Sequence, residues 1–450
     1  MLVFTHHRRG LLKTGLIAAV GCSAAAAVAS AETLPVAHTF TLARAAEAVA
    51  TITASCARCD WGVAGREAAV LRLEVDGGYS QHVLLTRGEE AADYSVFLGP
   101  LPAGRRTLTI IRDTARSAKN AGEVHVRRVD VRAIDPESAE HAWFAEAPIV
   151  HARPETVERF SDLPLAAYAE VLPARRGYRY TIVFSHEDGG TPTDRLMATW
   201  GRATDIESVY ESEQLRVGGA RQEYQGPGHE ILPFAGTRIG SHPLLWVSTD
   251  NNMVSDSGPP DAVRFALMPQ LINLANVSRE TFMDANPWLY AVMRAELIRE
   301  GLIDRAAPAG SGKIPDPLSF AYVEACGELR DAMLAFDVGV AAGGPIVWHA
   351  TDRGDTRFRI SRSGCFRAAV PLPAGVAPAD LRALRARAYT RPPRQDEAAL
   401  PRGSGKATLT RVNTMFMLND EFEPVHSGAK WVGSLAVPAD AAAVTIAFDK

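Results

Sequence analysis

Short segments in which apolar and polar residues alternate constrain the fold of this chain more than any other feature. Residues 69–76 and 94–98 show this alternation, which sends successive side chains to opposite faces of a β-strand. Residues 76–78, Asp-Gly-Gly, supply a turn between such segments. Several short strands separated by turns are typical of an antiparallel sandwich. We therefore predict a β-sandwich over residues 32–134.

The rest of the chain extends this pattern. Strand-like segments recur after residue 318 and predict a second β-sandwich over residues 318–450. Residues 150–304 combine strand-like segments with long polar loops, and the Pro- and Gly-rich stretch 305–317 is typical of a linker. A length of 450 residues suits two or three domains at ~150 residues each. The predicted fold class is mainly β, with β-sandwich modules flanking a central β-rich α+β domain.

One helix is predicted at the end of the central domain. Asn286 can cap it, Pro287 suits its first turn, and Gly301 can end it. We expect one face of this helix to pack against a sheet. The residues predicted on that face are Leu289, Val292, Met293, Leu297 and Ile298.

The N-terminus has the plan of an export signal. Basic residues precede a short apolar run, and small residues end at Ala31, so we predict a signal peptide over residues 1–31. The pair Arg8 and Arg9 is typical of twin-arginine export. A lipoprotein cysteine at Cys22 is the alternative. The mature chain contains no further segment apolar enough to span a membrane, and we expect a periplasmic or secreted protein.

The charge balance disfavours one class of partner. The full chain carries 48 Lys and Arg against 52 Asp and Glu, a formal net charge of −4. Removal of the basic signal segment makes the mature chain more acidic. Nucleic-acid binding needs a basic surface, so we predict that nucleic acid is not a partner.

Four cysteines remain after the signal segment. An even number in an oxidising compartment predicts two disulfides, with three possible pairings. Closeness in sequence favours Cys56 with Cys59, and Cys326 with Cys365. A redox-active Cys56–Cys59 pair is an alternative, although such pairs stand at the start of a helix and here a strand is predicted to follow.

Polar residues in the central domain are the candidates for chemistry. His186 and its neighbours follow a predicted strand, while Asp205 and Glu207 stand two residues apart within one and therefore face the same side. Neighbouring carboxylates either bind a cation or hold a proton between them. The predicted catalytic residues are His186, Asp205 and Glu207. The predicted ligands of a divalent cation, calcium or magnesium, are Asp194, Asp205, Glu207, Asp250, Asn252 and Asp256. These residue types are also the ordinary constituents of turns, which is the competing interpretation.

The segment Asp205-Ile206-Glu207 resembles the aspartate-tryptophan-glutamate strand motif of necrosis-inducing secreted toxins and of a vacuolar-sorting-associated domain family. In the toxins the two acidic residues help to hold a divalent cation, together with an upstream aspartate and a histidine. The resemblance implies that Asp205 and Glu207 match the acidic pair and that Asp194 matches the upstream aspartate. Ile206 replaces the tryptophan, and Arg202 stands where the histidine would be. More broadly, the chain resembles an uncharacterised secreted bacterial family.

Two functions are consistent with these features. The first is a protein acting on an extracytoplasmic polymer or surface, as a hydrolase assisted by a divalent cation. The second is a non-catalytic protein that binds a carbohydrate or a cell surface, with structural cation sites and exposed aromatic side chains such as Trp61 or Trp348. The sequence contains no nucleophile elbow, zincin helix or phosphate-binding loop. A polysaccharide or cell-surface ligand is the predicted partner.

Overall fold

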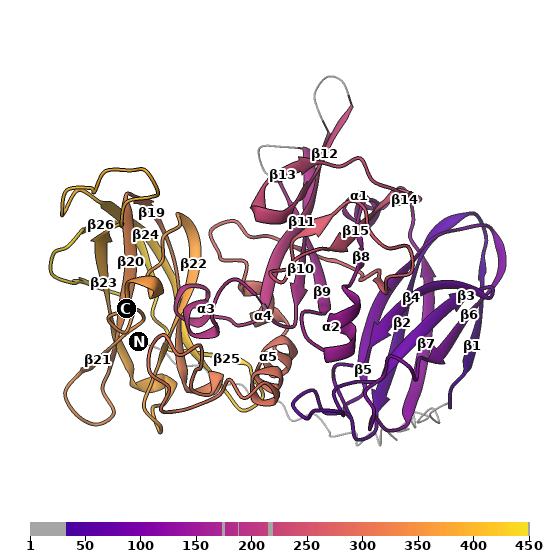
Figure 1. Ribbon diagram of the computed structural model, residues 1–450, viewed down its shortest axis with the longest axis horizontal. Coiled ribbons are helices and arrows are strands. Elements are labelled where there is room, and N and C mark those ends of the chain that lie inside the picture. The colour runs from indigo at the N-terminus through magenta and orange to yellow at the C-terminus, as the bar shows by residue number, and fades with distance from the viewer. Residues whose placement is uncertain (1–32, 173–175, 188, 215–218, 449–450) are drawn as a thin grey trace, which may run out of the picture. The chain divides into compact units, whose positions relative to one another are not determined.

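A computed structural model describes residues 33–172, 176–187, 189–214 and 219–448 (Figure 1). The described residues belong to one compact unit. Strands make up 46% of the structure and helices 12%, which confirms the predicted mainly β class. No helix within the described residues is long and apolar enough to cross a membrane. The predicted signal peptide, its cleavage site and Cys22 lie outside the described residues.

The N-terminal part consists of two antiparallel sheets that enclose an apolar core. The alternation in the sequence is the cause, because Leu71 and Leu73 point into the core and Arg72 and Glu74 point away from it. Asp76 and Gly77 adopt positive φ in the turn that follows. One sheet contains β1 (Val36–Leu42), β6 (Gly104–Arg112), β3 (Val70–Val75) and β4 (Gly78–Leu84), and the other contains β5 (Ala92–Leu101), β2 (Ala46–Cys56) and β7 (Val124–Ala133).

The central part contains two further sheets. The larger has the order β13 (Ile231–Pro233), β12 (Ala220–Gln225), β11 (Asp205–Gln214), β10 (Arg176–Phe184), β9 (Pro164–Val171) and β18 (Gln270–Ile272). The smaller contains β14 (Arg238–Ile239), β15 (His242–Val247), β8 (Ile149–His151) and β17 (Arg264–Phe265), with β16 (Val254–Ser255) paired to β15. Strands β9 to β12 pair in sequence order, as antiparallel neighbours joined by short loops commonly do.

Five α-helices accompany these sheets among the described residues: α1 (Ala139–Phe144), α2 (Pro154–Arg159), α3 (Thr193–Trp200), α4 (Thr281–Ala285) and α5 (Trp288–Arg299). The predicted helix is α5, and Leu289, Val292, Met293 and Leu297 are buried as predicted. The prediction was wrong for Ile298, which is 45% exposed. It was also wrong for Asn286, whose amide donates to the carbonyl of Phe282 at the end of α4 and does not cap α5.

The C-terminal part is a second pair of facing sheets around its own apolar core, in which Leu334, Phe336 and Phe366 are fully buried. One sheet has the order β22 (Gly364–Pro371), β19 (Phe320–Arg330), β24 (Lys406–Leu418) and β25 (Pro424–His426), with β26 (Trp431–Pro438) paired to β24. The other has the order β21 (Val347–Ala350), β20 (Ala332–Val340), β23 (Leu381–Thr390) and β27 (Val444–Ile446).

Both predicted disulfides are present. Cys56 ends β2 and pairs with Cys59 in the turn that follows, with 5.4 Å between the Cα atoms. Cys326 of β19 pairs with Cys365 of the adjacent β22, with 3.9 Å between the Cα atoms. The second bridge therefore joins directly opposite residues of neighbouring strands. These disulfides fit a protein that works in an oxidising compartment.

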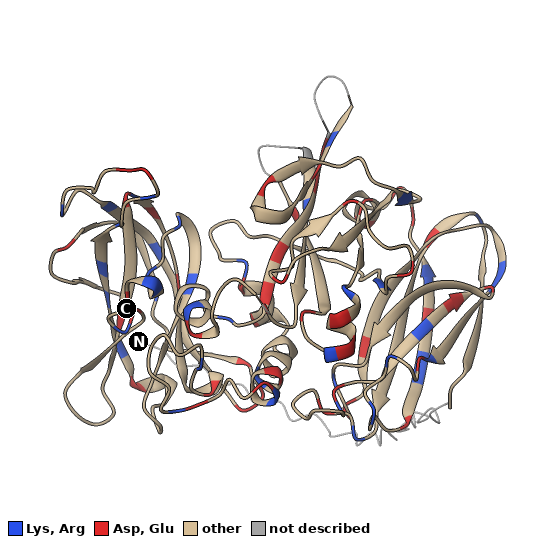
Figure 2. Cartoon of the chain, viewed as in Figure 1, with Lys and Arg blue, Asp and Glu red and all other residues tan. Residues whose placement is uncertain are grey.

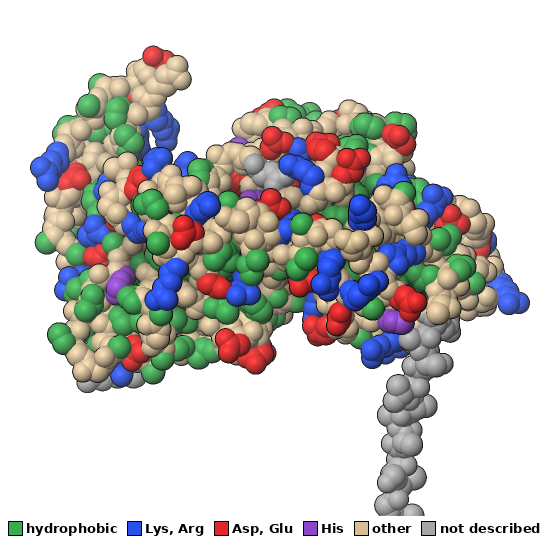
Figure 3. All heavy atoms as spheres, turned by 60° about the horizontal axis from the view of Figure 1, so that its bottom comes forward, with side chains coloured by type: hydrophobic (Ala, Val, Ile, Leu, Met, Phe, Trp, Pro, Cys, Tyr) green, Lys and Arg blue, Asp and Glu red, His purple; other side chains and the backbone are tan. Residues whose placement is uncertain are grey.

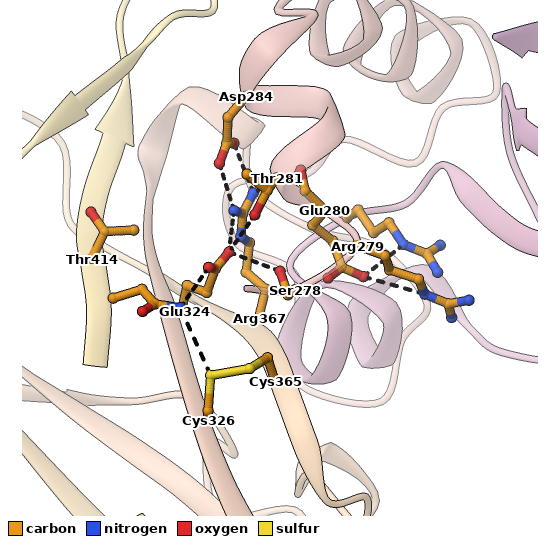
Figure 4. A network of polar contacts seen from close by, with 12 residues as sticks. Ser278, Arg279, Glu280, Thr281, Asp284, Glu324, Cys326, Cys365, Arg367 and Thr414 are labelled. Atoms are coloured by element: carbon orange, nitrogen blue, oxygen red, sulfur yellow. Dashed lines mark hydrogen bonds and ion pairs between the residues drawn. A yellow bond between two sulfur atoms is a disulfide. The ribbon is translucent and has the colours of Figure 1, made fainter. Parts of the chain in front are cut away.

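A buried ion-pair network joins the C-terminal sheets to the central helices (Figure 4). Arg367 of β22 has a fully buried side chain, and its guanidinium donates to Asp284 of α4 at 2.6 Å and to Glu324 of β19 at 2.6 Å. Gly201, at φ +65° after α3, leaves room for this side chain, because a Cβ there would lie 2.6 Å from Cγ of Arg367. The charged residue is tolerated in the interior because two carboxylates compensate it.

The stretch 305–317 is anchored by polar contacts to α3. The carboxylate of Asp194 accepts hydrogen bonds from the backbone N–H groups of Gly310 at 2.8 Å and Gly312 at 3.2 Å. Ile314 is buried and forms a bridge with Ile303. A carboxylate at the start of a helix thus fixes a segment whose composition suggested a linker.

Candidate functional site

The acidic pair Asp205 and Glu207 lies at the start of β11, and Figure 2 shows acidic residues along this strand. In the register of the sheet, Asp205 faces Phe184 of β10 and Glu207 faces Ile182. Ile206 between them is fully buried in an apolar cluster. The two carboxylates therefore share the side of the strand opposite to Ile206, as their spacing predicts.

Asp205 is almost completely removed from solvent, with 1% of the residue exposed. Burial, and then repulsion from Glu207, raise the pKa of Asp205 to about 7, against the attraction of Arg202. The guanidinium of Arg202 lies 3.6 Å from Oδ1 of Asp205 and donates to Glu280 at 3.2 Å. Arg202 is therefore shared between two carboxylates and does not fully compensate Asp205.

Glu187 is the second carboxyl group with a raised pKa. It follows β10, and burial together with repulsion from Asp205 raises its pKa to about 7. The backbone N–H of Thr191 donates to Oε1 of Glu187 at 2.9 Å. The charge of Asp205 therefore acts on Glu187, and the two carboxyl groups titrate in the same pH range.

Two glycines allow the loop after Glu187 to fold back. Gly190 adopts φ +88°, and a Cβ there would lie 2.9 Å from Oε1 of Glu187. A Cβ on Gly189 would lie 2.4 Å from Cβ of Asp250. These close approaches bring the loop at 249–252 next to the one that carries Glu187.

Asn252 connects these loops at the centre of the site. It is fully buried at φ 59°, and its amide nitrogen donates to Asp205 at 3.0 Å, to the carbonyl of His186 at 3.2 Å and to Asp162 at 3.4 Å. Its Oδ1 is buried and accepts no hydrogen bond from the described residues. A buried oxygen without a hydrogen-bond donor can bind a donor group of a ligand or a cation.

Arg153, which directly precedes α2, forms ion pairs with residues of two of these loops. Its guanidinium donates to the buried carboxylate of Asp162 at 2.8 Å and to Asp250. Asp250 was predicted as a metal ligand, but the structure shows its carboxylate 70% exposed and in an ion pair with Arg153.

The His186 imidazole interacts electrostatically with a different buried group, Glu296 of α5. Burial raises the pKa of Glu296, whereas the charges of His186 and Arg299 and hydrogen bonds from Ser161 and Trp61 oppose the rise. The indole N–H of Trp61 donates to Glu296 at 2.8 Å, and Trp61 is only 3% exposed. Trp61 is therefore a structural tryptophan and not the exposed stacking residue considered above.

Glu207 has its own polar neighbours. The amide of Gln225 donates to Glu207 at 3.0 Å and also lies 3.0 Å from Nδ1 of His229. Arg279 lies 4.0 Å from Glu207 and 3.8 Å from Glu280. This places His229 beside Glu207, connected through Gln225.

The predicted site residues fall into two groups. Asp205, Glu207, Asn252 and the backbone of His186 converge, whereas Asp194 and Asp256 are engaged elsewhere. Asp256 accepts from the backbone of Ala235 at 2.9 Å, and Asp194 holds the 310–312 segment. Sequence reasoning placed Glu187 in the polar segment beside His186 but assigned it no role, and it missed Arg153, Asp162 and Gln225. No group of three or more His, Cys, Asp or Glu side chains among the described residues is arranged to hold a metal ion, and the cation remains a prediction.

Charged side chains of both signs are spread over the face of the protein shown in Figure 3. The basic and acidic side chains are mixed among apolar ones. The described residues on this face form no continuous basic band of the kind that tracks a phosphate backbone.

No known family pattern matches this chain, and no curated protein matches it. Among solved structures, the C-terminal domain of the sugar-binding protein EclA is 15% identical, with a TM-score of 0.18 over 23% of this chain and 70% of that one. A family 35 carbohydrate binding module from an environmental isolate is 15% identical, with a TM-score of 0.17 over 24% and 69%. Tandem family 51 modules of a glycoside hydrolase from Streptococcus pneumoniae are 11% identical, with a TM-score of 0.15 over 87% and 83%. TM-scores this low assign neither the fold nor the function.

Proposed function

We propose that this protein works outside the cytosol as a hydrolase of a polysaccharide, with Glu187 and Asp205 as its acid–base pair. One feature carries the proposal: Glu187 and Asp205 are carboxyl groups partly or fully removed from solvent, the charge of Asp205 acts on Glu187, and burial raises the pKa of each to about 7. At neutral pH such a pair holds about one proton between its members. One group can then donate a proton to a leaving group while the other accepts one from water.

Glu187 is the member that can meet a substrate. It is half-buried and stands in a loop, whereas Asp205 is buried behind it. We assign direct proton exchange with the substrate and water to Glu187, and we assign to the buried Asp205 the role of sharing the proton of the pair with Glu187. His186 acts as a positioning residue in this proposal, because its backbone carbonyl accepts a hydrogen bond from Asn252 while its imidazole interacts electrostatically with Glu296.

A divalent cation, calcium or magnesium, is a second element of the proposal. The buried Oδ1 of Asn252 has no hydrogen-bond donor among the described residues, and the carboxylate of Asp205 lies beside the same amide. Oxygen ligands of this kind suit a hard cation. Asp205, Asn252 and Glu207 are the residues that would hold it. When bound, the cation would neutralise the carboxylate charge and polarise a substrate oxygen.

The test is hydrolysis of a panel of neutral, amine-bearing and acidic polysaccharides by the mature protein, followed as release of reducing ends. We expect turnover with a maximum near pH 7, and we expect Glu187→Gln and Asp205→Asn each to lower kcat by about 100-fold or more. Glu230→Gln removes an exposed carboxylate of the same domain and serves as the control. Parallel assays with a chelator and with added calcium or magnesium measure the contribution of the cation.

Two results would contradict the proposal. One is the absence of turnover on every polymer across the pH range. The other is full activity of both carboxyl variants. Polysaccharide binding without turnover would favour the non-catalytic alternative, in which the same surfaces recognise a polymer and the buried carboxyl pair is structural.

A further inference from the structure

We propose that a cavity at Trp288, between the N-terminal sandwich and the central sheet, binds one sugar unit of a neutral or amine-bearing polysaccharide. The cavity measures about 220 Å³. This is below the ~300 Å³ at which pockets accept drug-sized molecules, and it suits a ligand the size of one sugar ring. The sugar class rests on the proposed function, whereas the location comes from the cavity and the charge preference from the depression beside it.

The walls of the cavity come from separate parts of the chain. Tyr94 and Val96 of β5 form one side, Leu165 of β9 and Leu267 form another, and Trp288 stands at the first position of α5. The hydroxyl of Tyr94 accepts from the backbone N–H of Arg87 at 3.1 Å and is therefore held in place. A rigid wall with aromatic and aliphatic surface suits the C–H face of a sugar ring.

Trp288 is the residue that points to a ligand. Its side chain is half-buried, lines the cavity, and packs against the apolar clusters of the N-terminal and central parts. The guanidinium of Arg87 lies 5.7 Å from the centre of the indole ring. Tryptophan combines a large apolar face with one donor, and a partly exposed Trp288 offers both to a molecule that stacks and accepts a hydrogen bond.

The rim of the cavity carries planar polar side chains. The amide of Gln270 donates to the amide oxygen of Asn286 at 3.2 Å, which orients both side chains at the opening. Gln270 keeps one N–H donor and one acceptor site beyond this contact, whereas the N–H groups of Asn286 are directed at Gln270 and at the carbonyl of Phe282. Paired donors and acceptors match neighbouring hydroxyl groups, each of which both donates and accepts.

A larger depression of about 670 Å³ adjoins the cavity and shares Thr86, Arg87 and Trp288 with it. A polymer that places one unit on Trp288 can therefore continue into this depression. Its lining contains a single basic residue, Arg87, which pairs with Glu90 at 3.0 Å. The acidic residues of the lining are Asp60, Glu89, Glu90, Asp420, Glu421 and Glu423. Their repulsion disfavours a polymer of uronic acids and favours neutral or amine-bearing units.

The test is calorimetric titration of the mature protein with soluble oligomers of glucose, mannose and glucosamine and with an oligouronate. We expect at least one neutral or amine-bearing oligomer to bind and the oligouronate not to bind. Trp288→Ala should weaken binding by about tenfold or more, and Gln270→Ala, at an exposed rim position, by a smaller factor. Trp431→Ala is the control, because Trp431 is a half-buried tryptophan of β26 that packs against the core of the C-terminal sandwich.

The outcomes separate this inference from the proposed function. Retained binding in the Glu187→Gln Asp205→Asn double variant, with loss in the two cavity variants, supports a sugar site at Trp288 whether or not turnover occurs. Gln270→Ala keeps the test valid if Trp288→Ala does not fold. Binding that is unchanged in the folded cavity variants, binding of the oligouronate in preference to the others, or binding of none of the oligomers would overturn the inference.

Discussion

At the scale of single residues, spacing predicted which carboxylates share a face but not what surrounds them. The i, i+2 spacing of Asp205 and Glu207 is a local property of a strand and survives in the structure. The partners of Asp205 could not be predicted in this way. Asn252 and Arg153 reach the site from loops that are distant from Asp205 in the sequence. Gly189 and Gly190 allow the loop that carries Asn252 to lie close to the one that carries Glu187. Glu187 gains its raised pKa only from that tertiary setting.

The buried carboxyl pair predicts how stability depends on pH. The pKa values of Glu187 and Asp205 are about 7 in the folded chain and near their ordinary values of 4.5 and 3.8 when unfolded. Between about pH 4 and 7 the folded chain retains protons that the unfolded chain has released, so the free energy of unfolding falls as pH rises. We expect this fall in the free energy of unfolding, on the order of a few kcal/mol, to be smaller in Asp205→Asn. Urea unfolding at pH 5 and pH 8 measures it, and an identical pH dependence in wild type and variant would contradict the explanation.

At the scale of elements, local signals located helices and strands better than they located their ends and contacts. The apolar periodicity and Pro287 identified α5, but the predicted cap Asn286 belongs to the end of α4. The stretch 305–317 looked like a linker because it is rich in Pro and Gly. Its anchoring depends on Asp194, more than a hundred residues earlier in the chain, and no local pattern could reveal that contact.

The anchoring of this stretch gives a prediction at the same scale. Asp194→Ala removes the acceptor of two backbone N–H groups, which costs about 1 to 3 kcal/mol of local stability. We expect faster proteolytic cleavage within residues 305–313, mapped by mass spectrometry. Asp256→Ala is the control, because its carboxylate binds the loop at Ala235. Equal cleavage of wild type and Asp194→Ala would show that other contacts hold the segment.

At the scale of the whole molecule, alternation and turn residues were sufficient for the fold class, because each sandwich is built from local strand patterns. They did not predict how the parts join. The joints use buried charged residues, Arg367 with Asp284 and Glu324, and Trp61 with Glu296. Sequence patterns place charged residues on the surface, since burial is favourable only when a partner compensates the charge. Those partners become known only when the chain is folded.

The central claim is that two carboxyl groups, Glu187 and Asp205, keep protons close to neutral pH. Its most direct test is a carbon-detected NMR titration of the carboxyl groups in the mature protein, with Glu187→Gln and Asp205→Asn used to assign the signals. We expect two coupled transitions with apparent pKa values of about 7. Titration of both groups near the ordinary carboxyl value of ~4 would contradict the claim and remove the acid–base pair on which the proposed function depends.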